Sequence, residues 1–212
     1  WHLGDNYPYR PQDRGFDESF WFPSSHINSL PDYWENDYFD DVYCHNGTRE
    51  RFEGYCTEVF FNQAMAWIQD RVEADEPFFA YLPTNAPHAP LWVPAEDREA
   101  VEAYFTEHEH LLPEVSPDLR PRIIRFLAMI RNLDTHMGRM RDFVQEQGID
   151  RDTLLIFMTD NGSTFGPFYY NAGMRGAKVS LWEGGHRVPC FIHWPDGNLG
   201  EPRDITGLTE VQ

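Results

Sequence analysis

The chain has 212 residues, of which 41% are hydrophobic, and it carries a formal net charge of −18. This length and apolar content allow a substantial buried core, and no apolar run is long enough to span a membrane. The acidic charge argues against nucleic acid or an anionic membrane surface as a partner, because both favour clustered Lys and Arg.

The first half of the chain predicts one helix-then-strand unit. Residues 57–72 carry apolar side chains at helical spacing and lead into the apolar run 78–82, which predicts a strand. The Pro- and Glu-rich stretch 83–117 follows, and it predicts a long loop with a short helix at about residues 95–104. Loops of that length on α/β scaffolds usually carry function.

A second unit of the same kind follows. Apolar residues repeat at helical period through residues 119–147, and Gly148 closes this predicted helix. The uninterrupted apolar run Leu154–Met158 then favours a strand buried on both faces of a parallel sheet. Another apparent buried strand contains Cys190, and since Cys44, Cys56 and Cys190 cannot all pair with one another, we expect no disulfide framework.

Asp160 and Asn161 come directly after the predicted strand Leu154–Met158. Ligands of open α/β sheets gather at the carboxyl ends of such strands. A carboxylate beside an amide oxygen is a pair of hard ligands that suits Ca²⁺ or Mg²⁺. An ordinary turn or helix cap is the alternative, because Asp-Asn-Gly is also common turn chemistry.

Several segments around this pair carry a family resemblance. In the family's order along the chain, they are Trp1-His2-Leu3-Gly4, Ala86-Pro87-His88-Ala89-Pro90, Thr159-Asp160-Asn161-Gly162, Arg175-Gly176-Ala177-Lys178 and Glu183-Gly184-Gly185-His186-Arg187-Val188-Pro189. With these motifs the chain resembles the sulfatase family, the arylsulfatase-like branch of the alkaline phosphatase superfamily. The resemblance implies an alkaline phosphatase-like α/β fold, with a mostly parallel sheet sandwiched by helices. We expect residues 1–212 to form a single partial catalytic domain, incomplete at both ends.

The same resemblance implies roles for individual residues. Asp160 and Asn161 would bind Ca²⁺, with Mg²⁺ as the second choice, together with carboxylates upstream of Trp1. His88 would contact the sulfate group and give a proton to the departing ester oxygen. Lys178 would neutralise charge on the sulfate oxygens, and His2 would hydrogen-bond the hydroxyl of the nucleophile. The ordinary alternatives are a satisfied buried histidine and a solvated surface lysine.

Two further groups of residues have structural interpretations. The glycines of Glu183-Gly184-Gly185 permit a tight turn, and Arg187 has the chemistry to brace that loop through a carboxylate. The aromatic cluster of Tyr33, Trp34, Tyr38 and Phe39 either pins its loop to the body of the protein or stacks on a sugar ring as part of a lid.

The nucleophile implied by the resemblance is a formylglycine made from the Cys or Ser of a C/S-x-P-x-R motif. None of the three cysteines has a Pro two residues later, and the nearest serine match, Ser29-Leu30-Pro31-Asp32-Tyr33, has Tyr in place of Arg. We therefore expect the formylglycine to lie outside this chain and the chain alone to be inactive.

The resulting prediction is a sulfuric ester hydrolase that acts on a small-molecule or carbohydrate sulfate monoester. A phosphomonoesterase or phosphodiesterase of the same superfamily is the first alternative, and a non-catalytic module that binds sulfated glycans is the second. The resemblance suggests a periplasmic or secreted protein, and the oligomeric state is left open.

Overall fold

The computed structural model describes residues 1, 3–4, 6–22 and 37–207. Its main helices are α1 (Cys56–Glu73), α2 (Ala95–Glu107) and α3 (Arg120–Glu146), and a one-turn helix α4 spans Glu183–His186. Within the described residues, strands β1 (Phe20–Trp21), β2 (Val42–His45) and β3 (Thr48–Arg51) form one antiparallel sheet, and β4 (Leu155–Met158) pairs with β5 (Cys190–His193) in another. Short 3₁₀ turns occur at Pro11–Arg14, Glu109–Leu111, Gly166–Phe168 and Pro195–Gly197.

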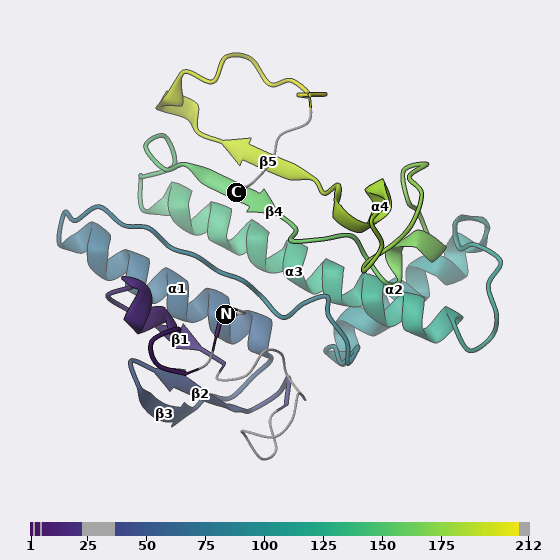
Figure 1. The fold of residues 1–212 in the computed structure, drawn as a ribbon, viewed down its shortest axis with the longest axis horizontal. Helices are drawn as coiled ribbons and strands as arrows, with labels where there is room; N and C mark the ends of the chain where they lie inside the picture. Colours follow the sequence, from purple (N-terminus) through teal and green to yellow (C-terminus); the bar gives the residue numbers. More distant parts are fainter. Residues whose placement is uncertain (2, 5, 23–36, 208–212) are drawn as a thin grey trace.

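Helices α1 and α3 form the centre of the structure. They run side by side in the same direction, and the chain after each one returns along its helix (Figure 1). Phe61 and Ile68 of α1 pack with Met140 and Val144 of α3 in one buried cluster. The helical periodicity predicted both helices, and the structure confirms them to within a residue or two at each end.

The end of α3 follows from its sequence. Gly148 has a φ of +70°, which a glycine adopts without the steric cost of a Cβ. The N–H of Ile149 then donates to the carbonyl of Val144 at 3.1 Å, which satisfies one of the last helical acceptors. This confirms Gly148 as the residue that closes the helix and turns the chain toward β4.

Helix α2 packs across α3, and it is longer than the sequence predicted. Val101 and Phe105 are buried against Ile123 and Ile124 of α3, so tertiary packing continues α2 to Glu107. Asp97 is buried as well, and its carboxylate accepts a hydrogen bond from the Asn132 amide at 2.8 Å. None of the helices in the described part of the chain is long and apolar enough to cross a bilayer.

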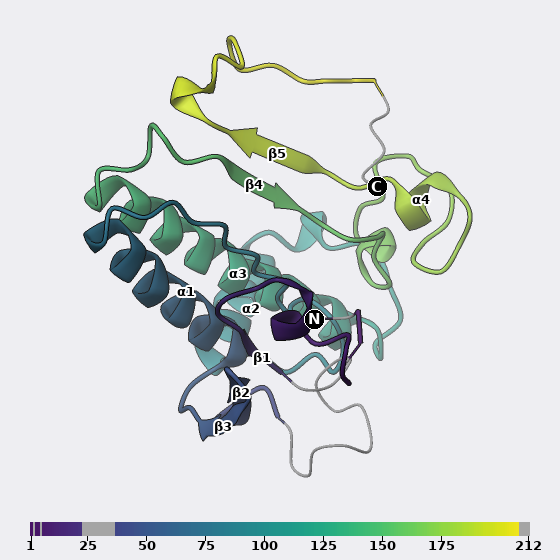
Figure 2. The same ribbon diagram turned by 60° about the vertical axis from the view of Figure 1, so that its left-hand side comes forward.

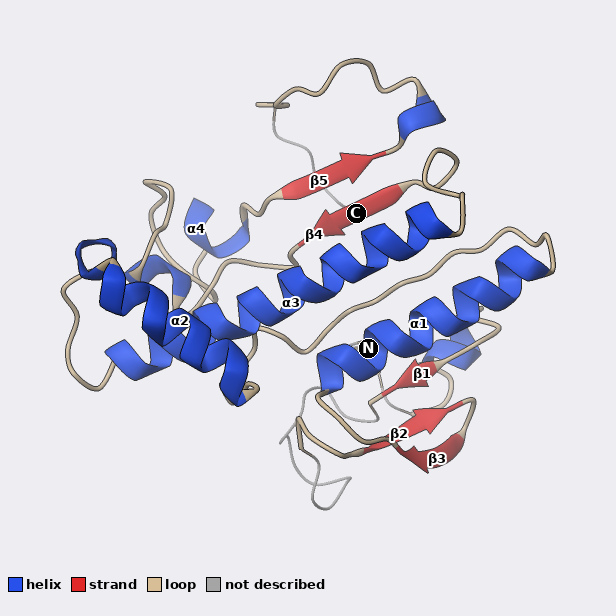
Figure 3. Ribbon diagram, turned by 180° about the vertical axis from the view of Figure 1, so that it is seen from behind, coloured by secondary structure: helices blue, strands red, loops and turns tan. Residues whose placement is uncertain are grey.

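The two sheets lie on opposite sides of the pair of helices α1 and α3 (Figure 3). Sheet β1–β2–β3 lies beside α1, and its β2–β3 turn is Asn46-Gly47, with φ values of +49° and +86°. Such an Asn-Gly pair is typical of a two-residue hairpin turn. The pair of strands β4 and β5 lies on the side of α3 (Figure 2).

The predicted strand at residues 78–82 is not formed, since the described residues provide it with no hydrogen-bonded neighbour. The segment is extended, and Phe78, Ala80 and Leu82 pack toward the helices in the cluster of α1 and α3. Phe79 and Tyr81 point the other way and are 73% and 55% exposed. The apolar pattern therefore predicted the extended conformation and the inward positions, whereas pairing depends on a neighbour that the pattern does not specify.

The strand after α3 is confirmed, but its expected surroundings differ. The prediction of burial on both faces of a parallel sheet is wrong here: β4 pairs antiparallel with β5, and Ile156 and Met158 are 49% and 39% exposed. Cys190, expected in a buried strand, is exposed at the start of β5. All strand pairs in the described residues are antiparallel, so the parallel pairing expected for this fold is not formed among them.

Candidate functional site

Asp160 and Asn161 lie where the sequence placed them, just past the end of β4. Asp160 is exposed and Asn161 is half-buried. The Asn161 amide donates a hydrogen bond to the Asp160 carboxylate, so the two side chains point at the same region. Carboxylate and amide oxygens fit a hard cation, but in the described part of the chain no group of three or more His, Cys, Asp or Glu side chains is arranged to hold a metal.

The next residue, Gly162, connects this pair to the glycine-rich turn of α4. Its N–H donates to the carbonyl of Gly185 at 2.9 Å. A Cβ at position 162 would lie 1.8 Å from the carbonyl oxygen of Gly184, a distance that no side chain tolerates. Glycine is therefore required at position 162 for the backbone of α4 to pack against the Asp160-Asn161 loop.

Lys178 is linked to the same loop through the backbone. Its N–H donates to the carbonyl of Ser163 at 3.2 Å, and the Ser163 hydroxyl accepts the N–H of Gly166 at 2.8 Å. The amide of Asn171 donates to the carbonyls of Met174 and Gly176 at 2.7 and 2.9 Å, which folds the intervening loop. The structure thus places Asp160, Asn161 and Lys178 on two loops that are joined by backbone hydrogen bonds.

The architectural interpretation of the Glu183-Gly184-Gly185 turn is supported by its packing. Gly184 and Gly185 are buried, and a Cβ on Gly184 would lie 2.3 Å from the carbonyl oxygen of Gly176. The expected bracing by Arg187 is not observed, because its guanidinium makes no ion pair with any residue that the structure describes. The loops are held together by backbone hydrogen bonds instead.

The local charge of these loops differs from that of the whole chain. Residues 171–187 contain Arg175, Lys178 and Arg187 but a single acid, Glu183, in a protein with a formal net charge of −18. Long-range repulsion of an anion would be offset here by nearby cations. The loops that carry the candidate site therefore suit an anionic ligand better than the rest of the protein does.

His88 lies on a separate loop, between the extended segment and α2. It is exposed; its N–H donates to the carbonyl of Asn85 at 2.8 Å, and its ring Nδ1 donates to the carbonyl of Ala89 at 2.6 Å. The backbone carbonyl of His88 accepts the hydroxyl of Tyr38 at 2.8 Å. These contacts fix both the loop and the orientation of the imidazole ring.

For Tyr38, the structure supports the interpretation in which the aromatic cluster pins its loop to the body of the protein. This residue is 1% exposed, its ring stacks on Tyr55, and burial raises the pKa of its phenol. Tyr38 therefore pins its loop to the body of the protein and holds the His88 loop as well. Tyr33 and Trp34 lie outside the described residues, as does the predicted site residue His2.

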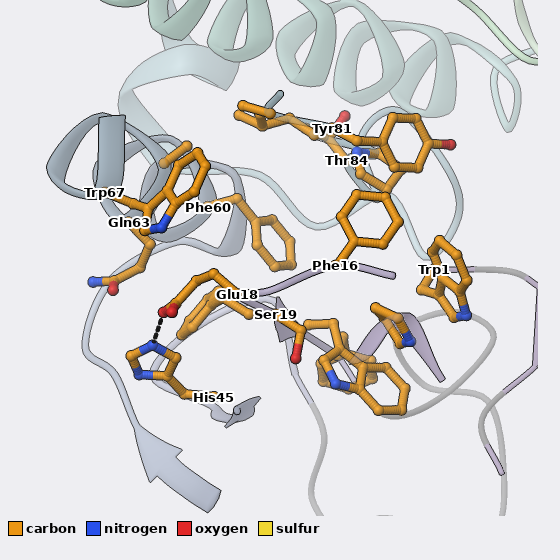
Figure 4. A pocket seen from close by; sticks show the side chains of 18 of the residues that line it. Trp1, Phe16, Glu18, Ser19, His45, Phe60, Gln63, Trp67, Tyr81 and Thr84 are labelled. Atoms are coloured by element: carbon orange, nitrogen blue, oxygen red, sulfur yellow. Dashed lines mark hydrogen bonds and ion pairs between the residues drawn. The ribbon is translucent and has the colours of Figure 1, made fainter. Parts of the chain in front are cut away.

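A hollow of about 280 Å³ lies between α1, the extended segment and the N-terminal residues (Figure 4). Aromatic rings dominate its wall, and its polar groups include the Glu18–His45 pair and Asp70. Asn85, whose carbonyl accepts the N–H of His88, is one of the residues that line the hollow. Because its ionised groups are mainly acidic, this hollow does not suit an anion, and the cationic loops around Lys178 remain the better candidate.

Sequence reasoning missed the residues that organise the site, Ser163 and Asn171. Their hydrogen bonds connect neighbouring backbone groups, as Ser and Asn side chains commonly do in turns. The signal for Ser163 was its position shortly after Asp160-Asn161-Gly162. For Asn171, the signal was its place at the start of a glycine-containing loop.

Comparison with known proteins identifies the family. A family model described as Sulfatase matches residues 1–208, and the chain therefore belongs to the sulfatase family. It is 28% identical to an arylsulfatase of Klebsiella aerogenes over 85% of this chain and 50% of that protein. It is 25% identical to human N-acetylgalactosamine-6-sulfatase over 92% of this chain and 36% of that protein. The chain thus spans half or less of the length of these curated relatives.

Solved structures agree on the fold. The crystal structure of Ps i-CgsB is 29% identical, has a TM-score of 0.74, and matches 92% of this chain and 43% of its own. The same protein in complex with k-i-k-neocarrahexaose gives a TM-score of 0.73. BT4656, in complex with its substrate D-glucosamine-2-N,6-O-disulfate, is 14% identical with a TM-score of 0.61 and therefore supports the fold alone. The alkaline phosphatase-like α/β fold is confirmed by these neighbours.

Proposed function

We propose that the protein hydrolyses a sulfate monoester. The observation that carries this proposal is the interlocking of the Asp160-Asn161-Gly162 loop with the loops of Lys178 and Gly184-Gly185. These segments are the ones that resemble the sulfatase family in sequence. Their joining through backbone hydrogen bonds supports a common role, because it holds the loop of Lys178 against the loop that carries Asp160 and Asn161.

The residues of this chain would act by binding and by proton transfer. Lys178 would pair with sulfate oxygens and offset the charge that develops as the ester bond breaks. His88, held by Tyr38 and Ala89, would give a proton to the departing ester oxygen. His2 would position the nucleophile, a formylglycine that we place outside this chain, and the relatives' greater length is consistent with that location.

Ca²⁺ is the metal that Asp160 and Asn161 would hold. Bound there, a divalent cation supplies Lewis acidity and charge neutralisation for an anionic ester. Ca²⁺ takes six to eight oxygen ligands, and this chain offers two adjacent side chains without a third acid close by among the described residues. We therefore expect weak binding by the chain alone.

Calorimetry tests the metal site. The chain should bind Ca²⁺ with a dissociation constant on the order of millimolar, the weak end of the range for protein Ca²⁺ sites, and Asp160→Ala should abolish that binding. Asp152→Asn removes one charge from the exposed loop before β4 and should leave the binding unchanged. Tight binding that survives Asp160→Ala would place the metal elsewhere.

An activity assay tests the location of the nucleophile. The purified 212-residue chain should release no measurable product from an aryl sulfate, because none of its cysteines lies in a C/S-x-P-x-R motif. Turnover by this chain would refute the proposal that the formylglycine lies outside it.

The same assay on a longer protein that contains this chain separates the alternatives. Hydrolysis of aryl sulfate but not aryl phosphate supports the sulfatase, and the opposite preference supports a phosphoesterase. Binding of sulfated but not desulfated oligosaccharides without turnover supports a non-catalytic module.

For the substrate we propose a small-molecule or carbohydrate sulfate ester, and for the compartment the periplasm or the outside of the cell.

A further inference from the structure

Lys178 occupies a turn with an unusual backbone. The N–H of Ser180 donates to the carbonyl of Ala177 at 3.0 Å, which closes a four-residue turn with Lys178 and Val179 at its centre. Val179 has a φ of +74°. That region is costly for a β-branched residue, and such turns ordinarily place Gly or Asn at this position.

Burial does not account for this conformation. The side chain of Val179 is 94% exposed, and that of Leu181 is 97% exposed, so neither packs against a neighbour that would compensate the strain. A residue persists in a sparsely populated region only when the surrounding structure enforces it. The restraint must therefore come from the residues that flank the turn.

Three contacts provide that restraint. The Ser180 hydroxyl accepts the N–H of Ala177 at 3.1 Å, within the turn itself. At the base, the N–H of Gly184 donates to the carbonyl of Arg175 at 2.8 Å. The guanidinium of Arg175 also stacks on the indole ring of Trp182, with 3.5 Å between its central carbon and the ring centroid.

We propose that Arg175 and Trp182 form a clamp that positions Lys178 for binding the sulfate group. Arg175 precedes the turn and Trp182 follows it, so their contact holds the two ends of the loop together. The strained turn between them, which carries Lys178, is thereby held in place. This inference rests on the proposed function for the role of Lys178. Arg175 and Trp182 are positioning residues in this scheme, because they act through the lysine.

The physical basis is pre-organisation. A lysine on a mobile loop loses conformational freedom when it binds an anion, and a clamped loop has lost part of that freedom already. Exposed cation–π contacts are weak individually. We therefore expect removal of the clamp to weaken sulfate binding by about two- to fivefold and not to unfold the protein.

The test uses the 212-residue chain, with backbone amide relaxation as the first readout and inorganic sulfate as the probe. In Trp182→Leu, the order parameters of the Lys178 and Ser180 amides should fall from about 0.85, the value of a rigid backbone, to below about 0.6. Trp182→Phe keeps an aromatic face and should retain most of the order. Circular dichroism should show the same melting temperature for all variants, because Trp182 is half exposed.

Sulfate titration then measures the consequence. Trp182→Leu should raise the dissociation constant for sulfate about two- to fivefold, whereas Trp182→Phe should remain near the wild-type value. Unchanged amide order in Trp182→Leu would overturn the clamp, and lost order with unchanged sulfate affinity would overturn its positioning role.

Lys178→Met separates failure of the clamp from failure of the proposed function. Loss of sulfate binding in this variant is the expected result. If Lys178→Met binds sulfate like the wild type, or if the wild type binds none, the role of Lys178 in the proposed function fails, while amide order in Trp182→Leu still decides whether the clamp holds the turn.

Discussion

Among the glycines that the structure describes, Gly162 is the one at which an added Cβ would come closest to another atom. Gly162→Ala would place a methyl group 1.8 Å from the Gly184 carbonyl oxygen, so the loops must separate. We expect a loss of about 1–3 kcal/mol in the free energy of unfolding, the usual cost of overpacking, together with faster hydrogen exchange of the amide at residue 162. Urea denaturation and exchange measured by NMR provide these values.

Gly138→Ala is the matched control for that substitution. Gly138 lies within α3, and a Cβ there would have no neighbour within 4 Å. Alanine should stabilise the helix by about 0.5–1 kcal/mol, because glycine loses more backbone entropy on folding. Equal effects of the two substitutions would mean that the close approach at Gly162 does not restrict the site.

Individual site residues were predictable to different degrees. Motif spacing along the chain indicated Asp160, Asn161 and Lys178 as candidate site residues, and their roles stay a prediction. The contacts of Ser163 and Asn171 were missed, since a side chain that bonds to neighbouring backbone leaves no distinct pattern in composition or periodicity. The burial of His136 was also not predicted, because this polar residue lies on the face of α3 where the helical period leads one to expect apolar residues.

At the scale of elements, His45 fastens the N-terminal segment to the β2–β3 hairpin. Its Nε2 lies 2.6 Å from the carboxylate of Glu18, and its Nδ1 lies 3.4 Å from that of Glu50. The hydrogen bond to Glu18 raises the pKa of His45, although partial burial acts in the opposite direction. Partial burial alone would raise the pKa of Glu18. Hydrogen bonds with Asn46 and His45 outweigh that effect, so the pKa of Glu18 is lowered.

This arrangement predicts a pH-dependent contribution to stability. A raised histidine pKa stabilises the folded state below the unfolded value of about 6.5, and this contribution is lost as the pH rises through the folded value. His45→Gln should therefore destabilise the protein at about pH 6 and have a smaller effect at about pH 8.5. Because His45 and Glu18 are both about one-third exposed, we expect a difference of less than about 1 kcal/mol.

Urea midpoints of the wild type and His45→Gln at several pH values measure that difference. His193→Gln is the control, because His193 is exposed on β5 and makes no ion pair within the described residues. A stability gap between wild type and His45→Gln that stays constant or widens as the pH rises would contradict the assignment.

Helices were easier to predict than sheets, and the reason is the range of the interactions. The helical repeat of apolar residues in α1 and in α3 can be recognised within each segment alone, because a helix forms its backbone hydrogen bonds within itself. Residues 78–82 and β4 have the composition of buried strands, but the neighbour of a strand lies elsewhere in the chain or outside it. The composition of these segments therefore predicted an extended conformation, but it did not determine which strand each one pairs with or how far it is buried.

At the scale of the whole molecule, the pair of strands β4 and β5 carries exposed apolar side chains on both of its strands. Ile156 and Ile192 are cross-strand partners on β4 and β5, and they are 49% and 54% exposed. Phe191, the neighbour of Ile192 on β5, is 64% exposed. Cross-strand apolar partners that are both about half exposed differ from the singly scattered apolar residues that are ordinary on protein surfaces.

We expect the folded chain to bind the dye 8-anilinonaphthalene-1-sulfonate, which reports exposed apolar surface. The double substitution Ile156→Thr with Ile192→Thr should reduce the dye fluorescence, because threonine keeps the strand propensity while removing apolar area from both partners. Leu111→Thr is the control: Leu111 is 42% exposed on the 3₁₀ turn after α2, away from the β4–β5 pair. Near-ultraviolet circular dichroism must show a packed structure in every variant, since dye binding by a loosened core would have a different cause. Equal fluorescence from the double variant and the wild type would show that the surface of β4 and β5 is covered in solution.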